Sequence, residues 1–263
     1  ILTSNGKLNI IDLDAGESIF QIQANTIGSY GTFSIDANGN WSYSADNNQA
    51  VIQSLGAGDT ISENFTVTSF DGSANTTITI TITGTNDIAI ISGNNNGLLT
   101  EDNAATLTIN GTLTVVDIDN GESEFQVQNN TVGTYGAFNL DSNGNWNYSA
   151  DNNQDAIQSL GVGDTLSDTF TTTTIDGTTE TVIITIKGTN DIAVISGDTS
   201  GGVTEDDAAI LTANGTLSAI DTDSGESGFQ TQTNTAGTYG TFSLNSSGNW
   251  SYSADNSQNA IQS

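Results

Sequence analysis

The sequence predicts an all-β protein made of tandem β-sandwich modules of about seven strands each, arranged in a line. One observation is a long repeat. Asn40-Trp41-Ser42 returns about 104 positions later as Asn145-Trp146-Asn147, and then as Asn249-Trp250-Ser251. The other observation is a series of short, alternating apolar segments separated by turn residues every 8 to 12 positions or so, a pattern typical of two packed sheets. A repeat of this length is a whole domain, and the chain is therefore an array.

The repeat divides the chain into modules at residues 1–86, 87–190 and 191–263. Only the second module is complete: compared with it, the first lacks its N-terminal part and the third lacks its C-terminal part. The chain contains no methionine, and we expect it to be a piece of a longer protein. A module of about 100 residues is large enough to bury a core of its own.

The strands of the complete module follow from local sequence patterns. We expect strands at residues 88–92, 106–116, 124–128, 136–140, 145–149, 168–175 and 179–187. We expect the second of these to be a strand pair broken at Asn110-Gly111, because this dipeptide favours a turn. Further turns are predicted at residues 141–144 and at Asp176-Gly177. A helical turn is expected only within residues 151–160.

The repeated tryptophans Trp41, Trp146 and Trp250 each follow a turn and begin a strand. A tyrosine lies two positions after each of them, on the same face of the strand. This spacing favours a core tryptophan packed between the sheets. A sugar-stacking platform, the alternative, usually needs several exposed aromatic side chains together.

The composition excludes several classes of function. Thirty-one acidic residues against two basic residues, Lys7 and Lys187, give a formal net charge of −29. Nucleic acid and anionic membrane surfaces are excluded as partners, because both require a basic surface. No apolar run approaches the length of a membrane span. Without histidine or cysteine, zinc and copper sites are not expected.

An enzyme is not expected either. The chain has no histidine, cysteine or arginine, and no Gly-x-Ser-x-Gly motif. Paired carboxylates could serve a glycosidase, but here every acidic pair recurs in each module and none stands alone in a cleft. This repetition favours a structural role.

Acidic motifs recur at fixed positions of the modules. Asp117/Asp119 and Asp221/Asp223 each follow an apolar strand and precede a glycine, as Asp12/Asp14 do in the first module. Taken alone, the motif also suits an Asx turn, and its spacing is not that of an EF-hand. With almost no lysine or arginine to pair with these carboxylates, a divalent cation is the simplest remaining partner.

The motifs of the repeat resemble those of the VCBS repeat family. The run from Gly31 to Gly72, with its Gly-Asn-Trp, Ala-Asp-Asn and Leu-Gly-Ala-Gly-Asp-Thr segments, and the following Gly-Thr-Asn-Asp carry the resemblance over the whole chain. VCBS repeats occur in very large secreted bacterial adhesins of the RTX type, which implies an extracellular location on a bacterial surface. The family usually has Ala-Pro-Val after Asn-Asp, where this chain has Ile88-Ala89 and Ile192-Ala193.

The order of the acidic motifs is also similar to that of cadherin repeats, which implies an immunoglobulin- or cadherin-like sandwich that binds Ca²⁺ between consecutive modules. Carried over to this sequence, the resemblance implies one set of ligands at each junction, with one expected ligand missing from each set. The first set is Asp46, Asn86, Asp87, Asp117, Asp119 and Asp176. The second set is Glu101, Asp151, Asn190, Asp191, Asp221 and Asp223.

Two functions compete at this point. The first is a structural spacer, a stalk of an extracellular bacterial adhesin whose junctions calcium stiffens, so that neighbouring modules of the chain are partners of one another. The second is an adhesive or self-associating module that binds surface glycans or like modules, in cell–cell contacts, in a biofilm matrix or in a fibre. Unpaired strand edges in the incomplete first and third modules leave fibre assembly open.

Overall fold

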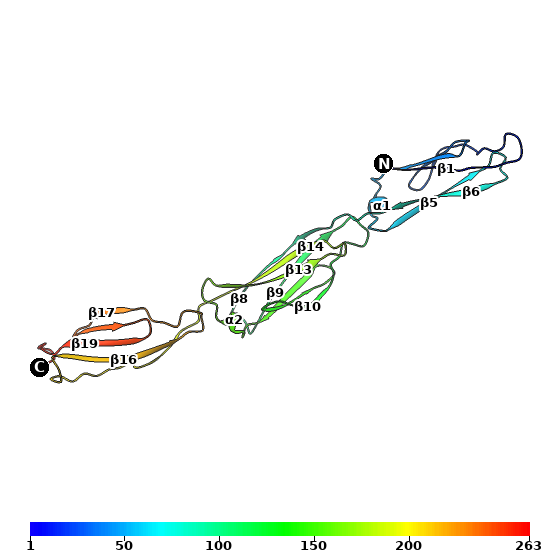
Figure 1. Cartoon of the computed structure of the whole chain (residues 1–263). Helices are drawn as coiled ribbons and strands as arrows, with labels where there is room; N and C mark the ends of the chain where they lie inside the picture. The colour runs from blue at the N-terminus through cyan, green and yellow to red at the C-terminus, as the bar shows by residue number, and fades with distance from the viewer.

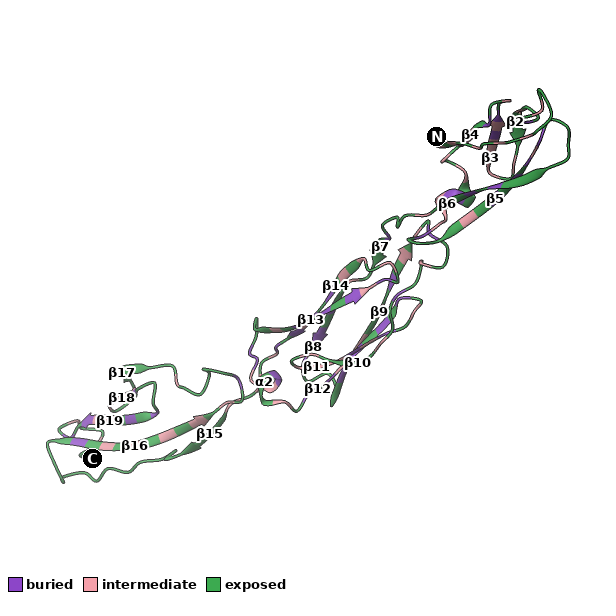
Figure 2. Ribbon diagram, turned by 45° about the vertical axis from the view of Figure 1, so that its right-hand side comes forward, coloured by how far each residue is buried: buried purple, intermediate pink, exposed green.

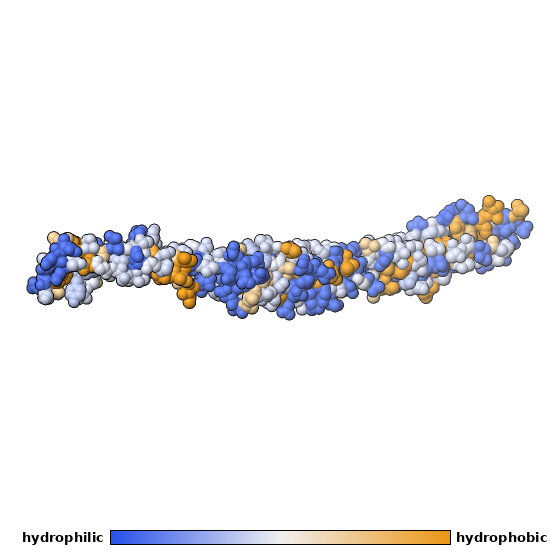
Figure 3. All heavy atoms as spheres, turned by 90° about the horizontal axis from the view of Figure 1, so that it is seen from below, coloured by the Kyte–Doolittle hydropathy of each residue, from blue (hydrophilic) through white to orange (hydrophobic).

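The computed structural model describes residues 1–263 and consists of three β-sheet modules joined end to end. The C-terminus lies at one end of the resulting rod, whereas the N-terminus lies at the end of the first module that faces the second module (Figure 1). The predicted all-β, linear architecture is confirmed. The rod is narrow, and its surface is largely polar with scattered apolar patches (Figure 3). No helix is long enough to cross a membrane, since the two helices have four residues each.

The second module consists of two sheets. The larger sheet has the order β10 (Gln128–Val132), β11 (Gly136–Leu140), β12 (Asn145–Asp151), β9 (Thr106–Val116) and β7 (Ile90–Gly93). The smaller sheet has the order β13 (Thr165–Thr173), β14 (Thr179–Lys187) and β8 (Asn96–Thr100), with β8 parallel to β14. A helical turn, α2 (Asp155–Gln158), connects the two sheets.

The outer modules contain parts of the same arrangement. In the first module, β1 (Leu2–Lys7), β4 (Asn40–Ala45), β3 (Gly31–Ile35) and β2 (Gln23–Ile27) form one sheet, β5 (Thr60–Thr68) and β6 (Asn75–Thr83) pair separately, and α1 is Ala50–Gln53. In the third module, the single sheet has the order β15 (Val194–Gly197), β16 (Ile210–Ile220), β19 (Asn249–Asp255), β18 (Thr241–Leu244) and β17 (Gln232–Ala236).

The core of the second module lies between its two sheets (Figure 2). Phe138 of β11 stacks on Phe170 of β13, with ring centroids 4.7 Å apart, so the two sheets meet through aromatic rings. Trp146 is 2% exposed and its indole Nε1–H donates to the carbonyl of Asn94 at 2.7 Å. The predicted position of this tryptophan in the core is confirmed.

The Asn110-Gly111 dipeptide does not break a strand. β9 runs uninterrupted from Thr106 to Val116, and Gly111 pairs with Trp146 within its register. The glycine is needed for space, because a Cβ at position 111 would lie 2.4 Å from the indole ring of Trp146. The prediction of a turn here was wrong, since a glycine can mark a close side-chain approach as well as a turn.

Two other strand predictions need correction. Of residues 124–128, only Phe125 forms a bridge, to Thr174, and the regular strand β10 begins at Gln128. No strand was predicted for β8. It pairs in parallel with β14, so both strands end at the junction with the third module. Its sequence contains glycine and asparagine, which weaken the pattern of alternation.

A buried carboxylate, Asp168, joins the two sheets of the second module. It is 3% exposed and accepts hydrogen bonds from the N–H groups of Thr134, Tyr135 and Gly136 at 2.6, 3.0 and 3.0 Å. It also accepts one from the hydroxyl of Tyr148 at 2.8 Å. Burial and the neighbouring carboxylate raise the pKa of Tyr148, so the hydroxyl remains the donor.

Candidate cation sites at the module junctions

Each Asp-x-Asp motif forms a compact loop at the N-terminal end of its module. In the second module, Asp117 Oδ1 accepts the N–H of Asp119 at 2.9 Å. The hydroxyl of Ser123 closes the loop by bonding both the N–H and the carbonyl of Asp117, at 2.9 and 3.2 Å. The motif is therefore an Asx turn, and this turn uses only one carboxylate oxygen of Asp117.

At the first junction, carboxylates of the second module hold the linker backbone. Asp119 Oδ2 accepts the N–H of Asp87 at 2.7 Å, and Asp176 Oδ2 accepts the N–H of Ala89 at 3.1 Å. Asp176 lies in the turn between β13 and β14, which brings it to the same end of the module as the Asp117 loop. Where VCBS repeats usually have a proline after Asn-Asp, Ala89 supplies an N–H that a proline would lack.

The second junction repeats this arrangement and adds a glutamate. Asp223 Oδ2 accepts the N–H of Asp191 at 2.9 Å, as Asp119 does with Asp87. Glu101 directly follows β8, so the parallel pairing of β8 with β14 brings its carboxylate beside the linker. There, Glu101 Oε1 accepts the N–H of Thr189 at 2.7 Å.

Four carboxylate oxygens at the junctions are buried without a hydrogen-bond partner. They are the only such side-chain nitrogen or oxygen atoms in residues 1–263: Glu101 Oε2, Asp117 Oδ2, Asp119 Oδ1 and Asp223 Oδ1. Glu101, Asp119 and Asp223 are each 2% exposed. All four residues belong to the ligand sets that the sequence implies.

The first module shows the same loop without a linker or a preceding module. Asp14 is the counterpart of Asp119 and Asp223, but it lies at the end of the rod and is exposed. Its N–H makes the same 2.9 Å Asx-turn bond to Asp12. The loop therefore has its shape without a neighbour, whereas its second aspartate is buried only where a linker and a preceding module are present.

The remaining predicted residues lie at the surface. Asp46 and Asp151 are exposed, and each uses Oδ1 to accept the N–H two residues later, from Asn48 and Asn153, both at 3.0 Å. No hydrogen bond connects either carboxylate to a junction. The roles of Asp46 and Asp151 as ligands stay a prediction. Asn86 and Asn190 are exposed, and each donates to the carbonyl of the next residue in the linker.

Three further acidic residues at the junctions were missed. Asp102 follows Glu101, adopts a left-handed φ of 62° and accepts bonds from Asn152 and Gln158 at 3.2 and 3.0 Å. Glu122 and Glu226 end the Asp-x-Asp-x-Gly-Glu segments. Their recurrence was visible in the sequence, and only the tertiary structure shows that they contact the preceding module.

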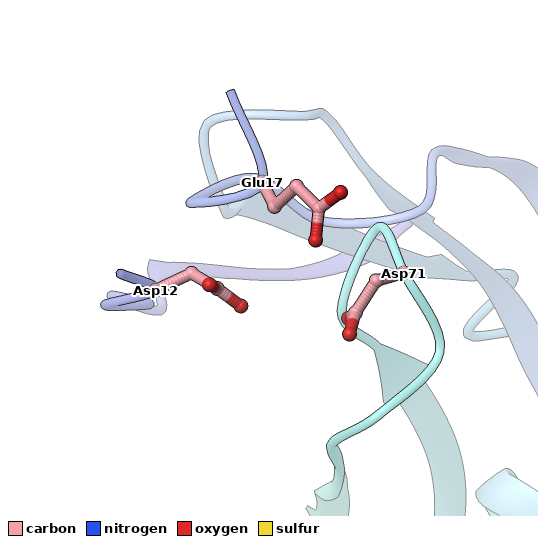
Figure 4. A group of neighbouring side chains, drawn as sticks. All are labelled: Asp12, Glu17 and Asp71. Carbon is pink, nitrogen blue, oxygen red and sulfur yellow. The ribbon is translucent and has the colours of Figure 1, made fainter. Parts of the chain in front are cut away.

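A cluster of acidic residues at the free end of the first module shows how the loop looks without a neighbour. Acceptor oxygens of Asp12, Glu17 and Asp71 all lie within 4.8 Å of one another (Figure 4). Hydrogen bonds from Ser69 and Ser73 lower the pKa of Asp71 to about 2. The counterparts in the second module, Asp117, Glu122 and Asp176, lie at the first junction.

The junctions disfavour the ionised form of several carboxyl groups within them. Burial raises the pKa of Glu101, and the charges of Asp102, Asp191 and Asp223 raise it further. The hydrogen bond from the N–H of Thr189 lowers the pKa but does not outweigh these effects. Burial likewise raises the pKa of Asp191, as do Asp102 and Asp223. The pKa of Glu122 is raised at the first junction by burial and then by Asp119, Asp117, Asp176 and Asp59.

Asp176 differs from these residues. Burial acts to raise its pKa, but hydrogen bonds from Thr174, Thr178 and the N–H of Ala89 outweigh it and hold the pKa well below its usual range. Asp176 is therefore ionised at any pH near neutrality, beside the linker.

Without calcium, we expect the melting temperature to rise as the pH is lowered from 7 to about 5. Carboxyls with a raised pKa, such as Glu101 and Asp191, give stability that is fully present below their unfolded values, about 4.3 and 3.9, and is lost as the pH rises through the folded values. Asp176 acts oppositely, but only below about pH 3.9. Calorimetry in chelator checks this, and a melting temperature that falls between pH 7 and 5 would contradict it.

The donor set fits a hard divalent cation. Calcium takes six to eight oxygen ligands at about 2.3–2.6 Å, from carboxylates, carbonyls and water. The junctions supply unpartnered carboxylate oxygens from the Asp-x-Asp loops of both junctions and from Glu101, and exposed linker asparagines beside them. No histidine or cysteine is present for a softer metal.

Comparison with known proteins gives a family for the chain. The sequence profile described as "Bacterial cadherin-like domain" matches residues 1–84 and 86–188. The chain is similar to the protocadherin gammaB7 EC3-6 cis-dimer structure, with 15% identity and a TM-score of 0.44, over 94% of this chain and 59% of that chain. It is also similar to the protocadherin GammaB4 extracellular domain, with 15% identity and a TM-score of 0.42, over 96% of this chain and 40% of that chain.

The chain spans between 40% and 63% of the length of the first solved structures that it matches. The comparison with curated proteins gave no match. The two matched segments of the family profile cover most of the chain. Cadherin-like domains are extracellular modules of the adhesion or spacer type. The chain belongs to the bacterial cadherin-like domain family.

Proposed function

We propose that the chain is part of the stalk of an extracellular adhesin, and that calcium at each junction holds consecutive modules in line. The four buried, unpartnered carboxylate oxygens carry this proposal. A charged oxygen that is buried without a hydrogen-bond partner is costly, and two junctions of the same chain repeat the arrangement. A bound cation would supply the missing partner in each.

The charge of the whole chain supports a cation as that partner. A formal charge of −29 with two lysines leaves almost no internal counter-ion, and self-repulsion of this size opposes a compact junction unless cations neutralise it. The proposal takes the modules to belong to a large secreted adhesin on a bacterial surface, of the RTX type, as the resemblance to VCBS repeats implies. Twelve residues remain the proposed ligands: Asp46, Asn86, Asp87, Glu101, Asp117, Asp119, Asp151, Asp176, Asn190, Asp191, Asp221 and Asp223.

Calcium should bind and stabilise the wild-type chain. At a calcium concentration 100 times the dissociation constant, one site contributes about 2.7 kcal/mol, and the melting temperature should rise accordingly. The double variant D119N/D223N should lose most of this gain, because both junctions lose a buried ligand. The variant D36N/D141N, which removes two exposed carboxylates from hairpin turns and leaves both ligand sets unchanged, is the matched control. Equal calcium responses of wild type and D119N/D223N would disprove the proposal.

Association with like modules or glycans stays the alternative. A molecular mass that rises with protein concentration in calcium would favour lateral association, whereas a constant monomeric mass agrees with a spacer.

A further inference from the structure

The last residue of each Asp-x-Asp-x-Gly-Glu segment reaches the preceding module. Glu122 Oε1 lies 2.5 Å from the point where a Cβ on Gly56 would stand, and Glu226 Oε1 lies 2.9 Å from the corresponding point on Gly161. Both glycines open a Leu-Gly-x-Gly-Asp loop that follows the helical turn of their module. The glutamate therefore occupies the space that a side chain on the preceding module would fill.

A backbone hydrogen bond fixes this contact at both junctions. The N–H of Asn120 donates to the carbonyl of Ser54 at 3.0 Å, and the N–H of Ser224 donates to the carbonyl of Ser159 at 3.0 Å. Each bond lies two residues before the glutamate on one side and two residues before the glycine on the other. The two loops are thus held in one register at both junctions.

Each glutamate lies beside a buried aspartate of its own loop, and neither has a hydrogen-bond partner within the chain. The side chain of neither Glu122 nor Glu226 accepts a hydrogen bond in the structure. The same Cβ point on Gly56 lies 3.6 Å from Asp119 Cβ, and that on Gly161 lies 3.7 Å from Asp223 Cβ. Asp119 and Asp223 are the buried aspartates whose Oδ1 atoms are unpartnered.

We propose that Glu122 and Glu226 are additional ligands of the junction cation, and that Gly56 and Gly161 are required to make room for them. This inference rests on the proposed function. The first module has the same motif but no preceding module. There, Glu17 lies close to Asp12 and Asp71 (Figure 4). At each junction the glutamate then joins the aspartates of its own module against the loop of the preceding one.

Calcium titration calorimetry on the full 263-residue chain tests this inference. E122Q/E226Q keeps the shape of both side chains and should weaken calcium binding at the junctions at least tenfold, because carboxylate count sets calcium affinity. G56A/G161A keeps every charge and should weaken binding similarly, because the added methyl groups displace the glutamates. The control E124Q/D155N, which removes two exposed charges, should bind like wild type.

The outcomes separate this inference from the function on which it rests. If E122Q/E226Q binds calcium like wild type while D119N/D223N does not, the glutamates are not ligands and the junction site stands without them. If D119N/D223N also binds like wild type, the proposed function fails. Melting curves in chelator show whether each variant is folded, and a variant that is folded yet weak in calcium binding supports the proposal.

Discussion

Replacing Asp168 with alanine should destabilise the second module by about 3–5 kcal/mol, the usual cost of removing one member of a buried charged network. Three N–H groups and the Tyr148 hydroxyl would lose their acceptor at a site that is 3% exposed. The free energy of unfolding of a domain of this size is about 5–15 kcal/mol in total. The melting temperature of this module should therefore fall by more than about 10 °C. Scanning calorimetry of the whole chain measures it.

The chain itself provides the control for this substitution. Glu63 takes the place of Asp168 in the first module, where it accepts the hydroxyl of Tyr43 and the N–H of Tyr30. D168E should therefore be much milder than D168A. If the two variants lose the same stability, the carboxylate is not what joins the sheets.

Replacing Glu101 with glutamine should have opposite effects with and without calcium. In chelator, the change removes a buried negative charge beside Asp102, Asp191 and Asp223, and the amide oxygen can still accept the N–H of Thr189. We expect stability to rise by on the order of 1 kcal/mol, since an unpaired buried charge is costly. In saturating calcium, the same variant should lose a ligand and about 2 kcal/mol of the stabilisation that binding gives.

The reversal of sign makes this test specific. If Glu101 only packed against its neighbours, its substitution would change the free energy of unfolding equally with and without calcium. Glu205 is the counterpart of Glu101 in the third module and is exposed at the end of the rod, so E205Q should change neither value. A loss of stability by E101Q in chelator would show that its charge is already compensated within the chain.

The sequence predicted the class of fold well because alternation and turns are local. The strand at residues 179–187 was predicted with the bounds of β14, since Val182, Ile184 and Ile186 recur at every second position. Local patterns failed where tertiary contacts decide. Gly111 serves the Trp146 ring, and β8 is stabilised by parallel pairing with a strand about 87 residues away.

The site was predicted in part for the same reason. Repetition and the resemblance to cadherins assigned Asp119 and Asp176 to the first junction and Glu101 to the second, and the structure places each of them beside its own linker. Asp102 and Glu122 were missed because their positions depend on a left-handed turn and on a glycine in another module. Neither contact leaves a signal in a single repeat.

Small-angle X-ray scattering with and without calcium tests the central claim most directly. In saturating calcium, the account predicts the profile of a single straight rod with the length of the structure in Figure 1. After addition of chelator, it predicts a shorter average maximum dimension and the scattering of modules joined flexibly. D119N/D223N should give the flexible profile even in calcium. Identical wild-type profiles in calcium and in chelator would contradict the claim that cations hold these modules in line.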